Sequence, residues 1–124
     1  SGTRVLLVED NPINREVAEV LLGEVGLVVD AVETGRRAVE AVDEHAYALV
    51  LMDMQLPELD GPEATRQIRA HARHAALPIL AMTANAFAED RRTCLAAGMN
   101  DFVSKPVNPH DLYVALLRWL PPRA

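Results

Sequence analysis

Cysteine, long apolar runs and basic residues are all scarce in this chain, and each shortage excludes a class of protein. A single cysteine, Cys94, excludes an internal disulfide framework and suits a reducing compartment. No apolar stretch approaches the roughly 20 residues of a membrane-spanning helix, and the first residues show no basic-then-apolar signal peptide. We therefore expect a cytoplasmic location and no membrane contact by this domain, although a longer parent chain could be membrane-anchored.

The shortage of basic residues argues against nucleic acid as a direct partner. The 12 lysines and arginines are outnumbered by 18 aspartates and glutamates, which gives a formal net charge of −6. Proteins that bind a phosphate backbone instead carry clustered lysine and arginine. The sequence leaves the oligomeric state open.

The length and apolar content of the chain indicate a single domain. Its 124 residues are 50% hydrophobic, which is enough to bury one core. No repeat, low-complexity tract or internal linker interrupts it. We expect a domain over residues 4–120, preceded by a linker or cloning remnant at 1–3 and followed by a tail at 121–124.

Short apolar runs alternate with helical segments along the chain. The runs that predict strands cover residues 5–8, 27–32, 49–52, 79–82 and 102–103. Asn11 as an N-cap, with Pro12 at the first helical position, predicts a helix that ends near Gly26. Further helical segments are predicted from about residues 35, 62, 87 and 109, so that a helix follows every strand.

Five such strand-helix units predict an α/β fold with a doubly wound parallel sheet. Near-continuous apolar strands are typical of a parallel sheet covered by helices on both faces. Right-handed crossovers leave few topologies, and the flavodoxin-like (βα)5 order 2-1-3-4-5 is the natural one for five strands.

Polar side chains follow four of the five apolar runs. These are Glu9-Asp10, Asp53, Thr83 and Ser104-Lys105. The carboxyl ends of parallel strands share one edge of the sheet, and open α/β sheets bind their ligands there. Because the first and third strands are neighbours in the predicted order, Glu9, Asp10 and Asp53 should converge. Three converging carboxylates repel one another unless a cation neutralises them.

The residue types at this edge predict metal-assisted phosphoryl transfer. Oxygen-only ligands with room for water suit Mg²⁺. Lys105 supplies a fixed positive charge for a phosphoryl oxygen, and Thr83 supplies a hydroxyl donor.

Four segments, VLLVEDN, VLMDMQLPELDG, PILAMTANA and AAGMNDFVSKP, follow one another in this order. Together they resemble the receiver domain of two-component and phosphorelay signalling, and the resemblance covers essentially the whole chain. More narrowly, VEDNPIN, MDMQLPELDG, MTANAF and GMNDFVSKP are similar to the receivers attached to hybrid sensor histidine kinases rather than to those of transcription regulators.

The resemblance implies a role for each polar group. Asp53 would be the aspartate that accepts a phosphoryl group from phosphohistidine. The implied Mg²⁺ ligands are Glu9, Asp10, Asp53 and the backbone carbonyl of Gln55. Thr83 and Lys105 would contact the phosphoryl group, and Phe102 would swing inward as Thr83 moves. The Lys105-Pro106 bond is cis in similar domains.

Two departures from the commonest family pattern bear on the site. Glu9 stands where aspartate is commonest, and its longer side chain could reach the metal only through water. Gln55 and Asn85 lie two residues after Asp53 and Thr83, at positions that influence how fast the phosphoryl group is lost in this family.

The resemblance also implies a partner, a histidine kinase or a histidine-containing phosphotransfer domain. The contact surface around Asp53 would include Ile13, Asn14 and Val17 on the first helix and Pro106 in the loop after Lys105. Ile13 is apolar beside a polar site, so it suits a small, transient interface.

Three alternatives stay open at this stage. Asp53 could be the nucleophile of a phosphatase or transferase, although Gln55 stands where a second acid would be expected and no cap insertion is evident. The chain could be a stand-alone response regulator, or a degenerate receiver that only binds partners, although the acids and Lys105 are present. As a receiver it would be no enzyme beyond self-phosphorylation and autodephosphorylation, and a hybrid parent chain would be a histidine kinase.

Single residues also have plainer interpretations. Glu9 could be only a solvated loop cap, Phe102 only a core aromatic, and Thr83 only part of a helix-starting turn. Asp10 and Asp53, with Lys105 on a neighbouring strand end, are much harder to explain without a site.

Overall fold

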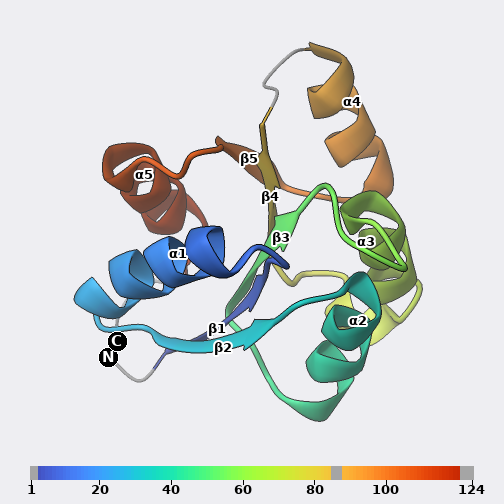
Figure 1. Ribbon diagram of the computed structural model, residues 1–124. Coiled ribbons are helices and arrows are strands. Elements are labelled where there is room, and N and C mark those ends of the chain that lie inside the picture. The colour runs from blue at the N-terminus through green and yellow to red at the C-terminus, as the bar shows by residue number, and fades with distance from the viewer. Residues whose placement is uncertain (1–2, 85–87, 121–124) are drawn as a thin grey trace.

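The computed structural model describes residues 3–84 and 88–120, which form one sheet with helices on both faces (Figure 1). The strands are β1 (Arg4–Val8), β2 (Val28–Val32), β3 (Leu49–Asp53), β4 (Ile79–Thr83) and β5 (Asp101–Ser104). The helices are α1 (Pro12–Glu24), α2 (Gly35–Glu44), α3 (Gly61–Arg69), η1 (Ala72–His74, one 3₁₀ turn), α4 (Ala88–Ala97) and α5 (Pro109–Trp119). All pairings are parallel in the order β2-β1-β3-β4-β5, which confirms the predicted flavodoxin-like topology.

Alternation along the strands divides the core into two layers. Val5 and Leu7 of β1 pack with α1 and α5, whereas Leu6 and Val8 pack with α2, α3 and α4. Figure 1 shows this division, with α1 and α5 on one side of the sheet and the other three long helices opposite. The strands β3 and β4 are buried along their whole length, as the apolar runs predicted.

Local capping sets the helix boundaries. The Asn11 side chain accepts hydrogen bonds from the backbone N–H groups of Ile13 and Asn14, and Pro12 occupies the first turn, so the predicted start of α1 is confirmed. The helix ends at Glu24, and Gly26 follows with φ 84°, a left-handed conformation that favours glycine.

Two other boundaries shift slightly from the predictions. The Asp60 side chain accepts from the N–H of Glu63, so α3 begins one residue before the predicted start at 62. The predicted start of the fourth long helix at Phe87 lies outside the described residues, and α4 is described from Ala88. No helix in the described part of the chain is long and apolar enough to cross a membrane.

Candidate functional site

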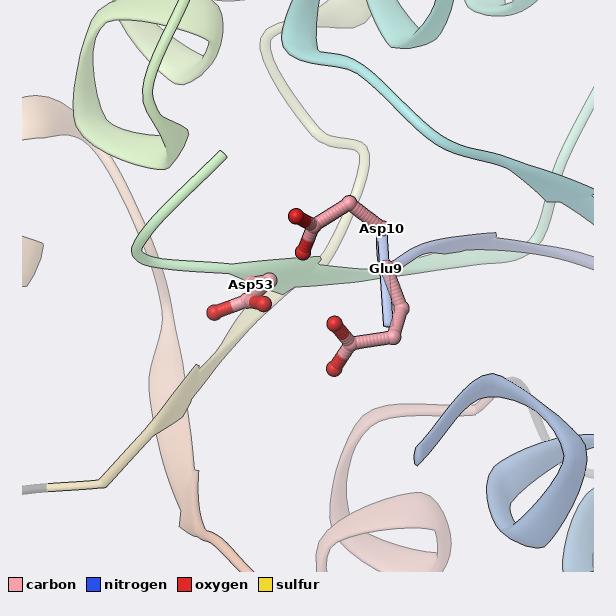
Figure 2. A group of neighbouring side chains, drawn as sticks. All are labelled: Glu9, Asp10 and Asp53. Carbon is pink, nitrogen blue, oxygen red and sulfur yellow. The ribbon is translucent and has the colours of Figure 1, made fainter. Parts of the chain in front are cut away.

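The three predicted carboxylates meet at the carboxyl edge of the sheet. Val8 pairs with Met52 in the register of β1 and β3, so the residues that follow Val8 lie beside Asp53. Figure 2 shows Glu9, Asp10 and Asp53 gathered there, and one carboxylate oxygen from each lies within 4.8 Å of the others. The cluster has the oxygen-only composition of a Mg²⁺ site.

Burial makes this cluster electrostatically unfavourable without a cation. Glu9 is 1% exposed and Asp53 is 2% exposed, while Asp10 lies at the surface. Two buried carboxylates side by side raise the energy of the doubly ionised state. The site therefore favours either a bound cation or a protonated acid.

Lys105 brings one positive charge to both buried acids. Its Nζ donates to Oδ2 of Asp53 at 2.9 Å and lies 3.4 Å from Oε1 of Glu9. The backbone N–H of Lys105 donates to the carbonyl of Thr83 at 2.8 Å, which continues the β4–β5 pairing beyond its last residue pair. The Lys105-Pro106 bond is cis, as the family resemblance implied.

The electrostatics of the cluster shift two pKa values. Burial, and then the hydrogen bond shared with Asp53, raise the pKa of Glu9 from 4.5 to about 7, although the N–H of Asn11 and the charge of Lys105 oppose the rise. Burial acts to lower the pKa of Lys105, but its contacts with Asp53 and Glu9 outweigh burial, so that the pKa is raised. Lys105 therefore stays charged.

Tight backbone packing fixes the position of Asp53. The N–H of Gln55 donates to Oδ1 of Asp53 at 3.1 Å, and the N–H of Gly61 donates to the carbonyl of Met54 at 3.2 Å. A Cβ on Gly61 would overlap the carbonyl oxygen of Asp53, so only glycine fits this close approach. The sequence indicated a turn at 60–61 but no close packing of Gly61 against Asp53.

Open clefts flank Asp53 on two sides. One, of about 800 Å³, extends past Asp10 and Asn14 on the α1 side. The other, of about 560 Å³, extends past Thr83 to Thr93 of α4. Gln55 and Lys105 line both. The sequence carried no signal for Thr93, because its approach depends on how α4 packs.

The two residues expected to move on phosphorylation lie on adjacent strands. Thr83 is 5% exposed at the end of β4, and Phe102 of β5 pairs with Ala81, two residues earlier. The Phe102 ring is half-buried, with the guanidinium of Arg91 4.6 Å from its centroid. This geometry places Phe102 near Thr83, and the predicted movement stays a prediction. Asn85 lies outside the described residues.

Apolar side chains are exposed on α1, the helix that contributes Pro12 and Asn14 to the first cleft. Ile13 is 73% exposed and Val17 45% exposed, while Asn14 is half-buried and lines the cleft itself. Pro106 is exposed in the loop after Lys105. Of the four residues predicted to form a partner surface, Asn14 therefore lines the cleft, while Ile13, Val17 and Pro106 are exposed on segments that contribute to it.

Comparison with known proteins decides the family. The model of the response regulator receiver domain matches residues 5–117. The chain belongs to the response regulator receiver family. This match confirms the predicted family, and the sheet order confirms the predicted fold. A receiver on its own is a signalling domain and not an enzyme with an external substrate.

The relatives of this receiver include large sensor kinases. The sensor protein GacS of Pseudomonas syringae pv. syringae is 44% identical over 119 residues, which cover 94% of this chain and 13% of GacS. Hybrid signal transduction histidine kinase B of Dictyostelium discoideum is 39% identical over 126 residues, which cover 93% of this chain and 6% of the relative. The receiver thus spans a small part of these relatives.

Solved receivers share the fold closely. The receiver domain of sensor histidine kinase PA1611 from Pseudomonas aeruginosa PAO1, solved with a magnesium ion in its active-site cleft, has a TM-score of 0.89 and 46% identity. That match covers 96% of this chain and 98% of the other. The Saccharomyces cerevisiae Ssk1 receiver, solved with the histidine phosphotransfer protein Ypd1, has a TM-score of 0.89 and 34% identity over 95% of this chain and 88% of the other.

Proposed function

We propose that this receiver accepts a phosphoryl group from phosphohistidine onto Asp53 in a Mg²⁺-dependent reaction. The observation that carries the proposal is the cluster of three carboxylates, with one oxygen from each within 4.8 Å of the others, in which the buried Asp53 is also paired with Lys105. A carboxylate in a cleft, beside a metal site and a fixed cation, suits attack on phosphorus.

The transfer balances without a further reactant. A carboxylate oxygen of Asp53 forms the new O–P bond, and the P–N bond of the phosphohistidine breaks. The electron pair of that bond returns to the imidazole nitrogen. Asp53 becomes an acyl phosphate, and the donor histidine becomes neutral after proton exchange with solvent.

The chain's own residues fit both the metal and the transferred group. Mg²⁺, when bound, supplies positive charge that stabilises phosphoryl oxygens. Its proposed ligands are Glu9, Asp10, Asp53 and the backbone carbonyl of Gln55. Lys105 would release its bond to the Asp53 carboxylate and pair with a phosphoryl oxygen, and the Thr83 hydroxyl would donate to another.

We further infer that the domain belongs to a hybrid sensor histidine kinase in the cytoplasm and exchanges its phosphoryl group with a phosphotransfer domain or kinase. The similarity to GacS and to the Ypd1-bound receiver supports this assignment over a stand-alone regulator. Docking would use Ile13, Asn14 and Val17 on α1 and Pro106 in the loop after Lys105. Self-phosphorylation and autodephosphorylation would be the only chemistry of the domain.

Labelling with acetyl phosphate and with a phosphorylated histidine phosphotransfer domain tests the proposal. The wild-type receiver should acquire one base-labile label with either donor in Mg²⁺, and peptide mapping should place it on Asp53. Chelation of Mg²⁺ and the Asp53→Asn substitution should each abolish the label. A label on another residue, or sustained turnover of a small phosphate ester, would overturn it in favour of a different acceptor or of a phosphatase.

A further inference from the structure

Arg15 connects α1 to the turn that carries the acidic pair. Its Nη1 donates to the backbone carbonyl of Glu9 at 3.2 Å and lies 3.2 Å from Oε1 of Glu33. The Nε of Arg15 lies 3.9 Å from Glu19, a looser contact one helical turn away. The Arg15 side chain is 21% exposed, so these contacts form in a largely covered position.

These contacts close a ring through three segments of the chain. The N–H of Glu9 donates to the carbonyl of Val32 at the end of β2, at 3.0 Å. Glu33 follows Val32 directly and holds the guanidinium of Arg15. Both backbone polar groups of Glu9 are therefore fixed, its N–H by β2 and its carbonyl by Arg15.

The turn needs such support because of the charge it carries. Glu9 and Asp10 lie against Asp53, and without a cation the three carboxylates push one another apart. A hydrogen bond from a charged donor is stronger than one between neutral groups. A bond to the backbone carbonyl also makes no use of the side-chain oxygens of Glu9 and Asp10.

We propose that Arg15 is a positioning residue that holds the Glu9-Asp10 turn in a metal-binding geometry before the metal arrives. The inference deepens the proposed function, and it rests on that function for the identity of the metal. Arg15 acts through the backbone of Glu9 and does not contact the metal or the phosphoryl group.

A simple charge effect of Arg15 would change the Mg²⁺ affinity in the direction opposite to a positioning effect. If Arg15 acted only as a nearby positive charge, it would repel Mg²⁺, and its removal would tighten metal binding. If Arg15 positions the turn, its removal should weaken binding. Lysine separates the two further. It keeps the charge but replaces the planar guanidinium, whose Nη1 contacts Glu9 and Glu33 while its Nε faces Glu19, with a single ammonium group.

Calorimetric titration of the whole domain with Mg²⁺ measures the direction in which each substitution changes the affinity. Arg15→Ala and Arg15→Lys should each weaken Mg²⁺ binding by about tenfold, as loss of a residue that orients metal ligands usually does. Glu33→Gln should weaken it less, because Arg15 keeps its bond to Glu9. The matched control is Arg37→Ala, which removes an exposed arginine whose ion pair is with Glu40 of its own helix, α2, and should leave affinity unchanged.

Amide hydrogen exchange without Mg²⁺ provides a second readout. The N–H of Glu9 and the N–H of Asn11, which donates to Oε2 of Glu9 at 3.1 Å, should exchange about tenfold faster in both Arg15 variants. The amides of α2 should not change.

The two readouts separate this inference from the proposed function. Unchanged or tighter Mg²⁺ binding by Arg15→Ala would overturn the positioning role. If the wild-type domain bound no Mg²⁺, the metal step of the proposed function would fall, and the exchange rates would then decide the role of Arg15. Faster exchange confined to this turn would support the role, and unchanged exchange would overturn it.

Discussion

Lys105 and Asp53 form an ion pair that ties β5 to β3 across the carboxyl edge of the sheet, with Nζ 2.9 Å from Oδ2. The Lys105 side chain is 19% exposed and the Asp53 side chain 3%. Removal of the cation would leave Asp53 and Glu9 as adjacent buried acids with no positive partner between them.

Lys105→Met should therefore destabilise the metal-free domain by about 2 kcal/mol, less than a fully buried pair would lose because Lys105 is partly hydrated. Urea unfolding in the presence of a chelator measures the change. Arg36→Met, which removes an exposed arginine 3.9 Å from Glu58, should change stability by less than about 0.5 kcal/mol. Equal changes in the free energy of unfolding would show that the buried pair stabilises the domain no more than the exposed one.

The raised pKa of Glu9 predicts how stability depends on pH. Because the pKa is about 7 in the folded protein and 4.5 ordinarily, the folded state binds the proton more tightly than the unfolded chain. The contribution of Glu9 is fully present below pH 4.5, is lost as the pH rises to about 7, and is level above that.

The melting temperature of the metal-free wild type, measured with a chelator, should fall over this window relative to that of Glu9→Gln. The difference between the two proteins cancels the contribution of every group that titrates equally in both. Glu9 is surrounded by three other titratable groups, Asp10, Asp53 and Lys105. If the melting temperatures of the two proteins changed with pH in the same way, one of these groups, and not Glu9, would bind the proton on folding.

Two glycines should respond to alanine in opposite directions. A Cβ on Gly61 would overlap the carbonyl of Asp53, whereas a Cβ on Gly23 in α1 would meet nothing within 4 Å. Gly61→Ala should cost at least about 2 kcal/mol through overpacking and slow the labelling of Asp53. Gly23→Ala should stabilise the domain by about 0.5–1 kcal/mol, since alanine loses less chain entropy in a helix. Thermal unfolding and acetyl phosphate labelling measure both effects.

The contact between Arg91 and Phe102 should hold the ring in its half-buried position. A cation over an aromatic face at an exposed site contributes about 0.5–1 kcal/mol. If Phe102 swings inward on activation, Arg91→Ala should strengthen the binding of beryllium fluoride, a phosphoryl mimic, by about two- to fivefold. Arg92→Ala, the adjacent exposed arginine, is the control. If a fluorescence or NMR titration gave the same affinity for Arg91→Ala and wild type, the contact between Arg91 and Phe102 would have no effect on the inward movement of the ring.

Ile13 should matter only for donors that dock. Ile13→Glu should slow transfer from a phosphorylated phosphotransfer domain by about tenfold or more, while labelling by acetyl phosphate stays near the wild-type rate. Leu117→Glu, at an 85% exposed position on α5, should slow neither reaction. Equal slowing with both donors would mean that the substitution damages the cleft, and the proposed partner surface would be abandoned.

The sequence alone determined the order of the elements, the sheet order and the edge where the acids gather. These follow from local signals: Asn11 caps α1, Asp53 ends a fully apolar strand, and five strand-helix units admit few right-handed topologies. The parallel sheet then forces the strand ends together, which is why Glu9, Asp10 and Asp53 were predicted to meet. Their roles as ligands and acceptor stay predictions until labelled protein is mapped.

Only the tertiary structure decided which residues support that site. The bond from Arg15 to the carbonyl of Glu9 and the close approach of Gly61 to Asp53 each depend on how a helix packs back against the strand end before it. The placement of Thr93 in the second cleft joins α4 to the end of β3. The burial of Glu9 and its sharing of Lys105 with Asp53 also arise there. Periodicity and capping report which face a residue takes on its own element, whereas distances between elements depend on how their surfaces pack.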